Sequence, residues 1–369
     1  MAVTSPGPVM DTFLQSVWYE RRAQWFSALL LPLSWLFAAV VGVRRAAYRN
    51  GWFRSFRVSR PVIVVGNVTV GGTGKTPITI WLAEQLRSRG VQVGIVLRGY
   101  GGRSAHWPRD VQPDTAWEEV GDEAVLLAQR TQALVVAGPD RVAAAKRAIE
   151  RGAEVVLCDD GLQHYRLARD GEIAVIDERR GLGNGRLLPA GPLREPAGRL
   201  AQVDLKVLTR RSGGVERPAA FANAMVATPV LGDAISIATG ERRSLQSFAG
   251  SRVHAVAGIG NPQAFFDSLT NLGLTVQAHP LPDHAPLTVA DISFADEAPV
   301  LMTQKDAVKC RAGALGNRPL ENRPLENRPM RNRLWAVHLD IAISPADAQA
   351  VAGLIDRWLA TPPPAATRR

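Results

Sequence analysis

The stretch Val62–Pro77 reads Val-Ile-Val-Val-Gly-Asn-Val-Thr-Val-Gly-Gly-Thr-Gly-Lys-Thr-Pro and decides the fold of this chain. Four β-branched residues at its start predict a buried strand, and an amphipathic segment that begins at Lys75 predicts a helix. A strand, a glycine-rich loop and a helix in this order are typical of a P-loop, whose backbone N–H groups surround phosphate. The predicted nucleotide-binding residues are Thr69, Val70, Gly71, Gly72, Thr73, Gly74, Lys75 and Thr76.

Two residues at the end of this loop are expected to carry its chemistry. Lys75 is expected to reach the β- and γ-phosphates of ATP, and the Thr76 hydroxyl is expected to bind Mg²⁺. Thr69 stands where the G-x-x-x-x-G-K-[ST] motif has its first glycine, so the match to that motif is incomplete. The alternative is a glycine-rich turn with a chance Lys-Thr pair, and the flanking strand and helix favour the phosphate-binding interpretation.

A second apolar run, residues 154–158, ends in Asp159 and Asp160. P-loop enzymes use a carboxylate at the end of a strand to hold the Mg²⁺ of the nucleotide. One or two carboxylates suffice, because Mg²⁺ keeps several of its waters. We therefore predict both aspartates as metal ligands, with a solvated turn as the alternative.

Strands and helices alternate along the chain, which predicts an α/β fold with a mostly parallel sheet and helices on both faces. We expect a P-loop core at residues 58–215 and a smaller second α/β domain at 216–369. An N-terminal segment, residues 1–57, precedes both, and repeated Asn-Arg-Pro units at 317–333 predict a loop insertion. The expected strands are 62–65, 91–97, 133–137, 154–158, 173–176, 205–208, 253–257, 274–278, 300–303 and 334–341, and the Gly- and Pro-rich stretch 181–199 is expected to be a long ordered loop.

The composition excludes several classes of protein. A hydrophobic content of 46% over 369 residues excludes a wholly disordered chain. Cys158 and Cys310 lack C-x-x-C spacing, so neither a disulfide framework nor a zinc site is indicated, and a reducing cytosolic setting fits. The net charge of +10 favours an anionic partner such as a nucleotide, a nucleic acid or a lipid surface.

Residues 25–43 carry no charged side chain, and pairs of arginines flank them on both sides. Tryptophans and arginines that bracket an apolar helix are typical of a segment at the headgroup level of a membrane. A membrane-spanning helix and an ordinary buried helix remain alternatives, and Pro32 is expected to kink the helix in its middle. A signal peptide is not favoured, because the apolar run starts late and leads into an ATP-type loop.

Eight short motifs, taken together, resemble the tetraacyldisaccharide 4′-kinase family of lipid A biosynthesis. Their order along most of the chain makes the resemblance specific, and in that family a threonine at the position of Thr69 is usual. The family often has a second histidine after Pro-Asp-His, whereas this chain has Ala285. The motifs occupy Gly66–Pro77, Arg98–Gly101, Gly121–Glu123, Asp159–His164, Leu187–Pro196, Gly258–Pro262, Pro282–His284 and Thr303–Lys309.

The resemblance implies an enzyme that moves the γ-phosphoryl group of ATP to the 4′-hydroxyl of a tetraacylated glucosamine disaccharide 1-phosphate. It also implies that Asp122 accepts the proton of the sugar hydroxyl, that His284 tunes Asp122, and that Lys75 acts on the phosphoryl charge. Glu123 is expected to join the metal ligands. The implied setting is the cytosolic face of the bacterial inner membrane, with a lipid substrate, a membrane contact, no nucleic acid and a monomeric chain.

Other functions are less well supported by the residues themselves. A regulatory GTPase is disfavoured, because residues 303–306 read Thr-Gln-Lys-Asp and Cys158 stands where a D-x-x-G motif needs its aspartate. A P-loop metallochaperone or nucleotide-dependent ligase would call for a Cys or His metal cluster or an acyl-acceptor pocket. A membrane-tethered nucleotide-binding scaffold without catalysis would tolerate the loss of Asp122 and His284.

Overall fold

The computed structural model describes residues 8–20, 24–210, 221–310 and 332–360. Two compact units account for them. Unit 1 takes its residues from 1–78, 154–228 and 343–369, and unit 2 takes its residues from 79–153 and 229–342. Each unit is thus assembled from separate stretches of the chain.

The sheet of unit 1 is built around β1 (Val62–Gly66). β1 pairs in parallel with β5 (Val155–Asp159) on one side and with β6 (Gly171–Asp177) on the other. β7 (Leu205–Thr209) and the start of β8 (Met225–Ser236) extend this sheet in the order β8-β7-β6-β1-β5, again in parallel. Every residue of β1 and β5 is buried, as expected for central strands covered on both faces. Burial of each large aliphatic side chain contributes about 2 kcal/mol to the stability of such a core.

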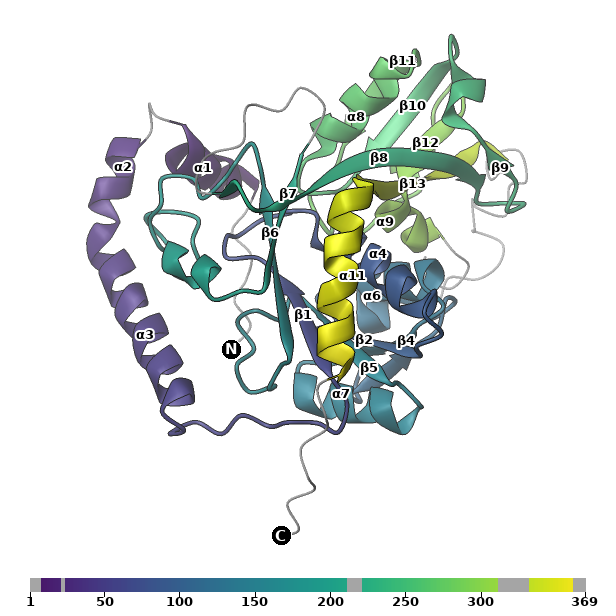
Figure 1. Ribbon diagram of the computed structural model, residues 1–369. Coiled ribbons are helices and arrows are strands. Elements are labelled where there is room, and N and C mark those ends of the chain that lie inside the picture. The colour runs from purple at the N-terminus through teal and green to yellow at the C-terminus, as the bar shows by residue number, and fades with distance from the viewer. Residues whose placement is uncertain (1–7, 21–23, 211–220, 311–331, 361–369) are drawn as a thin grey trace. The chain divides into compact units, whose positions relative to one another are not determined.

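Helix α11 (Pro345–Ala360) packs on the sheet of unit 1 (Figure 1). The buried indole of Trp358 lies against Gly171, at the start of β6. A Cβ at Gly171 would come within 2.4 Å of that ring, so only glycine allows the approach. The last described helix of the chain therefore belongs to the unit that holds the P-loop.

Three helices form the N-terminal part of unit 1: α1 (Pro8–Tyr19), α2 (Gln24–Leu29) and α3 (Leu31–Arg49). The prediction of one helix over 25–43 with a kink in its middle is wrong, because two helices, α2 and α3, occupy this stretch. Pro32 lies in the first turn of α3. Proline is well tolerated there, since the first N–H groups of a helix have no partner within the helix. Within the described ranges, no helix combines the length and the hydropathy that are needed to cross a membrane.

One part of unit 2 surrounds the parallel pair β2 (Val93–Leu97) and β4 (Leu134–Ala137). Helix α7 (Arg141–Glu150) begins after Asp140, whose side chain accepts hydrogen bonds from the backbone N–H groups of the first turn. Helix α6 (Asp122–Arg130) also packs against β4. This part of unit 2 thus positions Asp122 at the start of a helix.

The other part of unit 2 is a second mostly parallel sheet. β10 (Arg252–Ala257) pairs in parallel with β11 (Thr275–Pro280) and β12 (Val300–Thr303), and β12 pairs in parallel with β13 (Leu334–Ile343). Helix α8 (Pro262–Asn271) places Phe265, Phe266 and Leu269 in the core of this part. The remaining elements of the chain are α4 (Lys75–Arg87), β3 (Arg109–Val111), α5 (Trp117–Val120), η2 (Ala197–Ala201), β9 (Arg242–Arg243), η4 (Leu245–Phe248), η5 (Ala290–Ile292), α9 (Gln304–Ala307) and η6 (Val308–Cys310).

The α/β fold with mostly parallel sheets is confirmed, and each of the ten predicted strands has a counterpart. The strand β3 and the helix α5 lie between β2 and α6, in a stretch for which no regular structure was predicted. The 3-10 helix η2 likewise begins inside 181–199. The boundaries at 57/58 and 215/216 stay predictions, and the repeat at 317–333 lies almost wholly outside the described residues.

Candidate active site

The P-loop leaves β1 and leads directly into α4, which begins at Lys75. Gly71 and Gly74 adopt φ values of +101° and +81°, a region that residues with a Cβ rarely enter. A Cβ at Gly74 would also lie 3.1 Å from the methyl carbon of Thr209. The glycines are therefore required by the backbone path of the loop.

The loop is held from outside by two segments of unit 1. The Val70 N–H donates to the Pro192 carbonyl at 2.9 Å, and the Arg194 N–H donates to the Val68 carbonyl at 2.7 Å. On the other side, the Thr209 hydroxyl donates to the Thr73 carbonyl at 3.0 Å. The Gly- and Pro-rich stretch that contains Pro192 is thus an ordered loop next to the P-loop, as predicted.

The acidic strand end lies beside the P-loop, because β1 and β5 pair with Val65 opposite Asp159. Asp159 is buried, whereas Asp160 adopts a φ of +49° and is more exposed. Lys75 Nζ lies 3.5 Å from Asp160 Oδ1, and an Arg194 nitrogen lies 3.2 Å from both carboxylate oxygens of Asp160. The structure therefore brings together the predicted lysine, the predicted acids and an arginine that the sequence analysis did not single out.

These residues fit a nucleotide phosphate with its metal ion. Among the described residues, the buried atoms Asn67 Oδ1 and Thr73 Oγ1 have no hydrogen-bond partner. Two cations, Lys75 and Arg194, are available for the charge of a phosphate. In the part of the chain that the structure describes, no three His, Cys, Asp or Glu side chains form a metal cluster. Mg²⁺ that is shared with phosphate needs only one or two protein carboxylates, so Thr76 and Asp159 suit that role.

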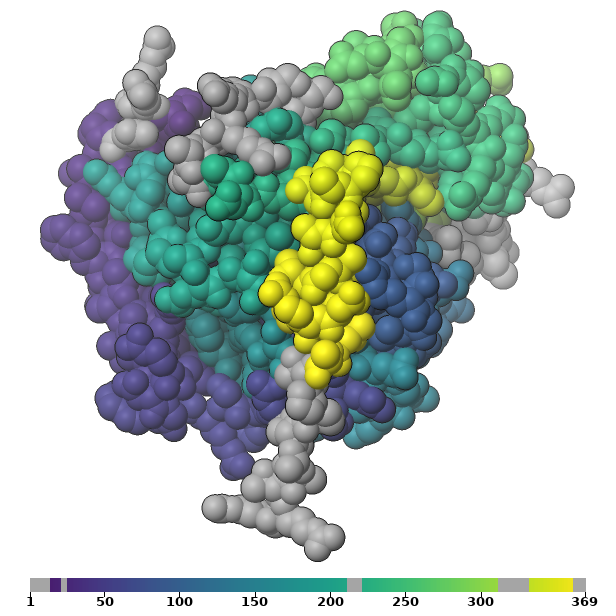
Figure 2. Space-filling view, in the orientation of Figure 1, coloured from purple at the N-terminus to yellow at the C-terminus, as the bar shows by residue number. Residues whose placement is uncertain are grey.

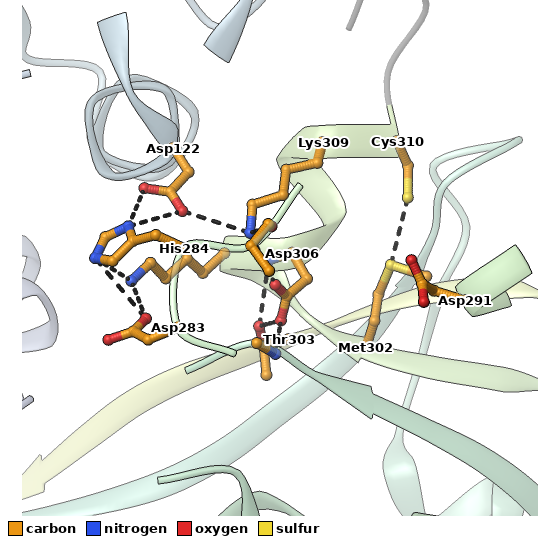
Figure 3. A network of polar contacts seen from close by, with 12 residues as sticks. Asp122, Asp283, His284, Asp291, Met302, Thr303, Asp306, Lys309 and Cys310 are labelled. Atoms are coloured by element: carbon orange, nitrogen blue, oxygen red, sulfur yellow. Dashed lines mark hydrogen bonds and ion pairs between the residues drawn. The ribbon is translucent and has the colours of Figure 1, made fainter. Parts of the chain in front are cut away.

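A second polar site lies in unit 2, where Asp122 and His284 meet although 162 positions separate them (Figure 3). His284 Nδ1 lies 3.0 Å from Asp122 Oδ1 and 3.2 Å from Oδ2. The Asp122 side chain is only 3% exposed, and its Oδ1 also accepts a hydrogen bond from the Glu123 N–H. This pairing agrees with the role that the resemblance implies for the two residues.

Two lysines complete this site. Lys309 is buried, and its Nζ lies 3.6 Å from Asp122 Oδ2 while it donates to the Ala285 carbonyl at 2.8 Å. Lys305 Nζ lies 3.1 Å from His284 Nε2 and 3.6 Å from a Glu123 oxygen. Glu123, a predicted metal ligand, therefore lies within unit 2 beside Lys305.

These charges set the protonation of the pair. Burial alone would raise the pKa of the Asp122 carboxyl, but the His284 hydrogen bond and the charges of Lys305 and Lys309 lower that pKa to about 2. For His284, burial lowers the pKa, but the hydrogen bond with Asp122 and the negative charges of Asp122 and Asp283 together outweigh it, so the pKa of the ring is raised. Asp122 is thus an ionised carboxylate at neutral pH.

Close backbone contacts fix the segment that precedes Asp122. Gly121 has a φ of +89°, and a Cβ there would lie 2.2 Å from the Tyr100 carbonyl oxygen. The Arg103 N–H donates to the Glu118 carbonyl at 2.8 Å, which joins the same two segments. The Tyr100 ring lies edge-on to the His284 ring with centroids 5.1 Å apart. The backbone before Asp122 is therefore packed closely against the segment that contains Tyr100.

Sequence reasoning missed Lys305, Lys309 and Arg194, although each lies in a motif that carried the resemblance. One signal could have found the lysines. The chain has 44 Lys and Arg residues but only five lysines, at 75, 146, 206, 305 and 309. Three of those five lie in the two polar sites.

Comparisons with known proteins show which family this chain is similar to. A family model described as tetraacyldisaccharide-1-P 4′-kinase (LpxK) matches residues 26–359. The tetraacyldisaccharide 4′-kinase of Methylobacillus flagellatus is 50% identical over 313 residues, which are 84% of this chain and 91% of that protein. The enzyme of the same name from Alkalilimnicola ehrlichii is 48% identical over 305 residues, 80% of this chain and 88% of that protein. The crystal structure of the "apo" form of LpxK from Aquifex aeolicus in complex with ATP superposes with a TM-score of 0.72 at 29% identity, covering 90% of this chain and 99% of that chain.

Proposed function

This chain belongs to the tetraacyldisaccharide-1-P 4′-kinase family, and from that premise we propose that it transfers the γ-phosphoryl group of ATP to the 4′-hydroxyl of a tetraacylated glucosamine disaccharide 1-phosphate. Membership of the family makes the chain a kinase. The proposal concerns its donor, its acceptor and the residues that act on them. The observation that carries it is Asp122, a buried carboxylate that stays ionised beside His284.

ATP as the donor is supported by the P-loop and by the solved relative that is in complex with ATP. We assign Thr69 to Thr76 to the phosphates, with Lys75 and Arg194 balancing the charge on the group that is transferred. Thr76, Asp159 and Asp160 offer the oxygen ligands that Mg²⁺ prefers, and bound Mg²⁺ supplies further positive charge at the phosphates. Glu123 remains an additional predicted ligand.

Asp122 is proposed to orient the sugar hydroxyl and to accept its proton. A carboxyl with a pKa near 2 is a weak base, so the proton moves to it only when the hydroxyl has largely bonded to phosphorus. This timing suits the loose transition state of phosphoryl transfer, in which the attacking oxygen gains bonding late. His284 holds the carboxylate in place through its Nδ1.

The acyl chains of the proposed acceptor lie in a bilayer, so the enzyme must work at a membrane surface. On α3, Leu33, Trp35, Leu36, Val40 and Val43 are each more than half exposed. Figure 2 shows α2 and α3 at the surface of the molecule, in purple. Exposed large apolar side chains in this number are typical of a membrane or partner contact. We assign them to the headgroup region on the cytoplasmic face of the inner membrane, where ATP is supplied.

Hydrogen bonds join these N-terminal helices to the Gly- and Pro-rich loop of the same unit. Trp18 Nε1 donates to the Pro189 carbonyl at 2.9 Å, and the Ser34 hydroxyl donates to the Leu187 carbonyl at 2.8 Å. The apolar residues of α3 are thus held outward by a polar contact on its inner side. A lipid acceptor accounts for this surface better than a nucleic acid, and we propose that one chain acts alone.

Two alternatives are disfavoured. A metallochaperone needs a cluster of Cys or His ligands, and the described residues contain none. A non-catalytic scaffold would not need a buried, ionised carboxylate. No observation favours either over a lipid kinase.

The test is phosphate transfer from labelled ATP to the tetraacylated disaccharide 1-phosphate in mixed micelles. Asp122→Asn keeps the shape of the side chain and removes its charge, so we expect turnover to fall at least about 100-fold while ATP still binds. Asp114→Asn is the matched control, because Asp114 is exposed and its loss should leave turnover unchanged. Wild-type protein that binds ATP but never phosphorylates the disaccharide would refute the proposed acceptor.

A further inference from the structure

Lys305 has no role in the mechanism proposed above, although it contacts His284. Its Nζ donates to Asp283 Oδ1 at 2.9 Å and lies 3.1 Å from His284 Nε2 and 3.6 Å from a Glu123 oxygen. The side chain is 14% exposed. Its three N–H groups are thus directed among two carboxylates and one imidazole nitrogen.

The chemistry of these partners fixes the direction of each hydrogen bond. An amine that donates to the Asp283 carboxylate remains an ammonium, and an ammonium has three donors and no acceptor. His284 Nε2 must therefore accept the hydrogen bond from Lys305, so it carries no proton. In the neutral ring the proton then lies on Nδ1, which is the nitrogen that faces Asp122 (Figure 3).

We propose that Lys305 is a positioning residue, whose ammonium keeps the ring proton of His284 on Nδ1 so that the imidazole donates to Asp122. The inference rests on the function proposed above, since it refines the role of Asp122 in that reaction. Asp283 makes this role of Lys305 necessary. Its Oδ1 lies 3.8 Å from His284 Nε2 and would otherwise attract a proton to that nitrogen. Without Lys305, the ring is expected to place a proton on Nε2.

The backbone around His284 supports the same arrangement. His284 has a φ of +59°, which costs about 1 kcal/mol or more for a residue with a Cβ. Lys309 holds the next peptide by donating to the Ala285 carbonyl, and the Ala285 N–H donates to the Pro282 carbonyl at 3.1 Å. The ring is therefore held between Asp122 and Lys305 by the main chain as well as by its own nitrogens.

This arrangement decides where the proton of the substrate goes. As the hydroxyl oxygen bonds to the γ-phosphorus, the bond from that phosphorus to the bridging oxygen breaks and ADP leaves with the electron pair. The hydroxyl proton passes to the Asp122 carboxylate and later to solvent. His284 cannot take it up through Nδ1, because that nitrogen already carries a proton. His284 is thus an orienting group and not a proton relay.

The tautomer can be read directly by ¹⁵N NMR on protein labelled at histidine, because protonated and unprotonated ring nitrogens give well-separated signals. Measurement at about pH 9.5 keeps the ring neutral, although the pKa of His284 is raised above that of an ordinary histidine. Signals lost in His284→Asn identify those of His284. We expect the wild type to show a protonated Nδ1 and an unprotonated Nε2. An unprotonated Nδ1, or a proton on Nε2, would overturn the proposal.

Three lysine variants separate this role from a general loss of charge. Lys305→Met should convert the Nε2 signal to the protonated type, whereas Lys305→Arg keeps a donor that cannot accept and should preserve the wild-type pattern. Lys146→Met removes the same charge at an exposed site of unit 2 and should change nothing. A Lys305→Met spectrum with the wild-type pattern would refute the assignment.

Kinetics give a second readout. Lys305→Met should lower kcat roughly 10- to 100-fold, with the KM for ATP within about twofold of wild type, as is common for groups that orient a catalytic residue. Lys305→Arg should recover most of that loss, and an Arg variant as slow as the Met variant would count against a donor role. Complete lack of phosphoryl transfer by the wild type would refute the proposed function, while the spectra would still decide the tautomer.

Discussion

The P-loop and the polar site around Asp122 are built in different ways. The P-loop is eight consecutive residues, 69–76, and its proposed ligand groups are mostly backbone N–H groups whose direction depends on Gly71 and Gly74. The site around Asp122 joins side chains from α6, from the segment around His284 and from α9 with η6. Conformation thus makes the first site, and tertiary packing makes the second.

The two sites also differ in whether the residues proposed for function contribute to stability. Lys75 is 14% exposed and pairs with the partly exposed Asp160, and such pairs contribute at most about 1 kcal/mol. Lys309 and Asp306 are fully buried, and Asp306 further accepts from the Gly258 N–H at 2.8 Å and the Thr303 hydroxyl at 2.6 Å. Loss of the Lys75 side chain should therefore impair catalysis alone, whereas changes around Lys309 should impair folding as well.

The largest effect is expected at Lys75. Lys75→Met removes a cation that is proposed to act on the transferred phosphoryl group, so kcat/KM should fall about 10³-fold. The free energy of unfolding, from urea titration, should stay within about 0.5 kcal/mol of wild type. Lys206→Met, on β7 of the same unit, is the control and should retain activity. A large loss of stability in Lys75→Met would break the comparison.

Lys309→Met tests the other half of the comparison. The substitution leaves Asp306 as a buried carboxylate without its cation, and breaking a buried pair costs about 3 kcal/mol or more. Urea unfolding should show that loss, and Lys146→Met should stay within about 0.5 kcal/mol of wild type. A cost below about 1 kcal/mol would mean that the site around Asp122 tolerates an unpaired buried charge, and that stability and function do not depend on the same residues there.

The parts of the fold that the sequence predicted are those with a local pattern, like the P-loop. Buried strands such as β1 and β5 are runs of β-branched and aliphatic residues. Such a local pattern can be recognised without knowledge of the tertiary contacts. β8 was not predicted from its residues, because Pro229 and Gly232 interrupt it and both are depleted in strand interiors. The short edge strand β3 has only three residues, Arg-Asp-Val, with no alternation to mark it.

The sites divide in the same way. The P-loop and Asp159 were predicted from spacing, because a strand end and a glycine loop are local features. The pairing of Asp122 with His284 came only from the family resemblance, since spacing says nothing about contacts between distant positions. Lys305, Lys309 and Arg194 act through such contacts too, and a single Lys or Arg in a sequence has the appearance of an ordinary surface residue.

The pH dependence of stability sharpens the comparison further. The Asp122 pKa falls from 3.8 to about 2 on folding, so the folded state favours the ionised form. The resulting stability is fully present above pH 3.8 and is lost as the pH falls through 2, and it amounts to about 2 kcal/mol. Unfolding free energies of wild type and Asp122→Asn at pH 6 and at about pH 2.5 measure it. An advantage of the wild type that stays constant with pH would show that Asp122 is not held ionised.

The smallest effect is expected on α3, a region that needs neither a special backbone nor a buried charge. Leu36 and Val40 are 64% and 58% exposed and lie one turn apart. Leu36→Glu or Val40→Glu should each weaken binding to anionic lipid vesicles about tenfold, because apolar area is lost and a negative charge is added.

The structure supplies a matched control for that change. Val230 on β8 is 39% exposed, so Val230→Glu makes the same exchange far along the chain from α3 and should leave vesicle binding within about twofold. Activity on substrate in detergent micelles should survive in all three variants, because none of these side chains is assigned to the phosphates or to Asp122. Equal weakening by Val230→Glu would mean that total charge, and not the apolar face of α3, governs the contact with lipid.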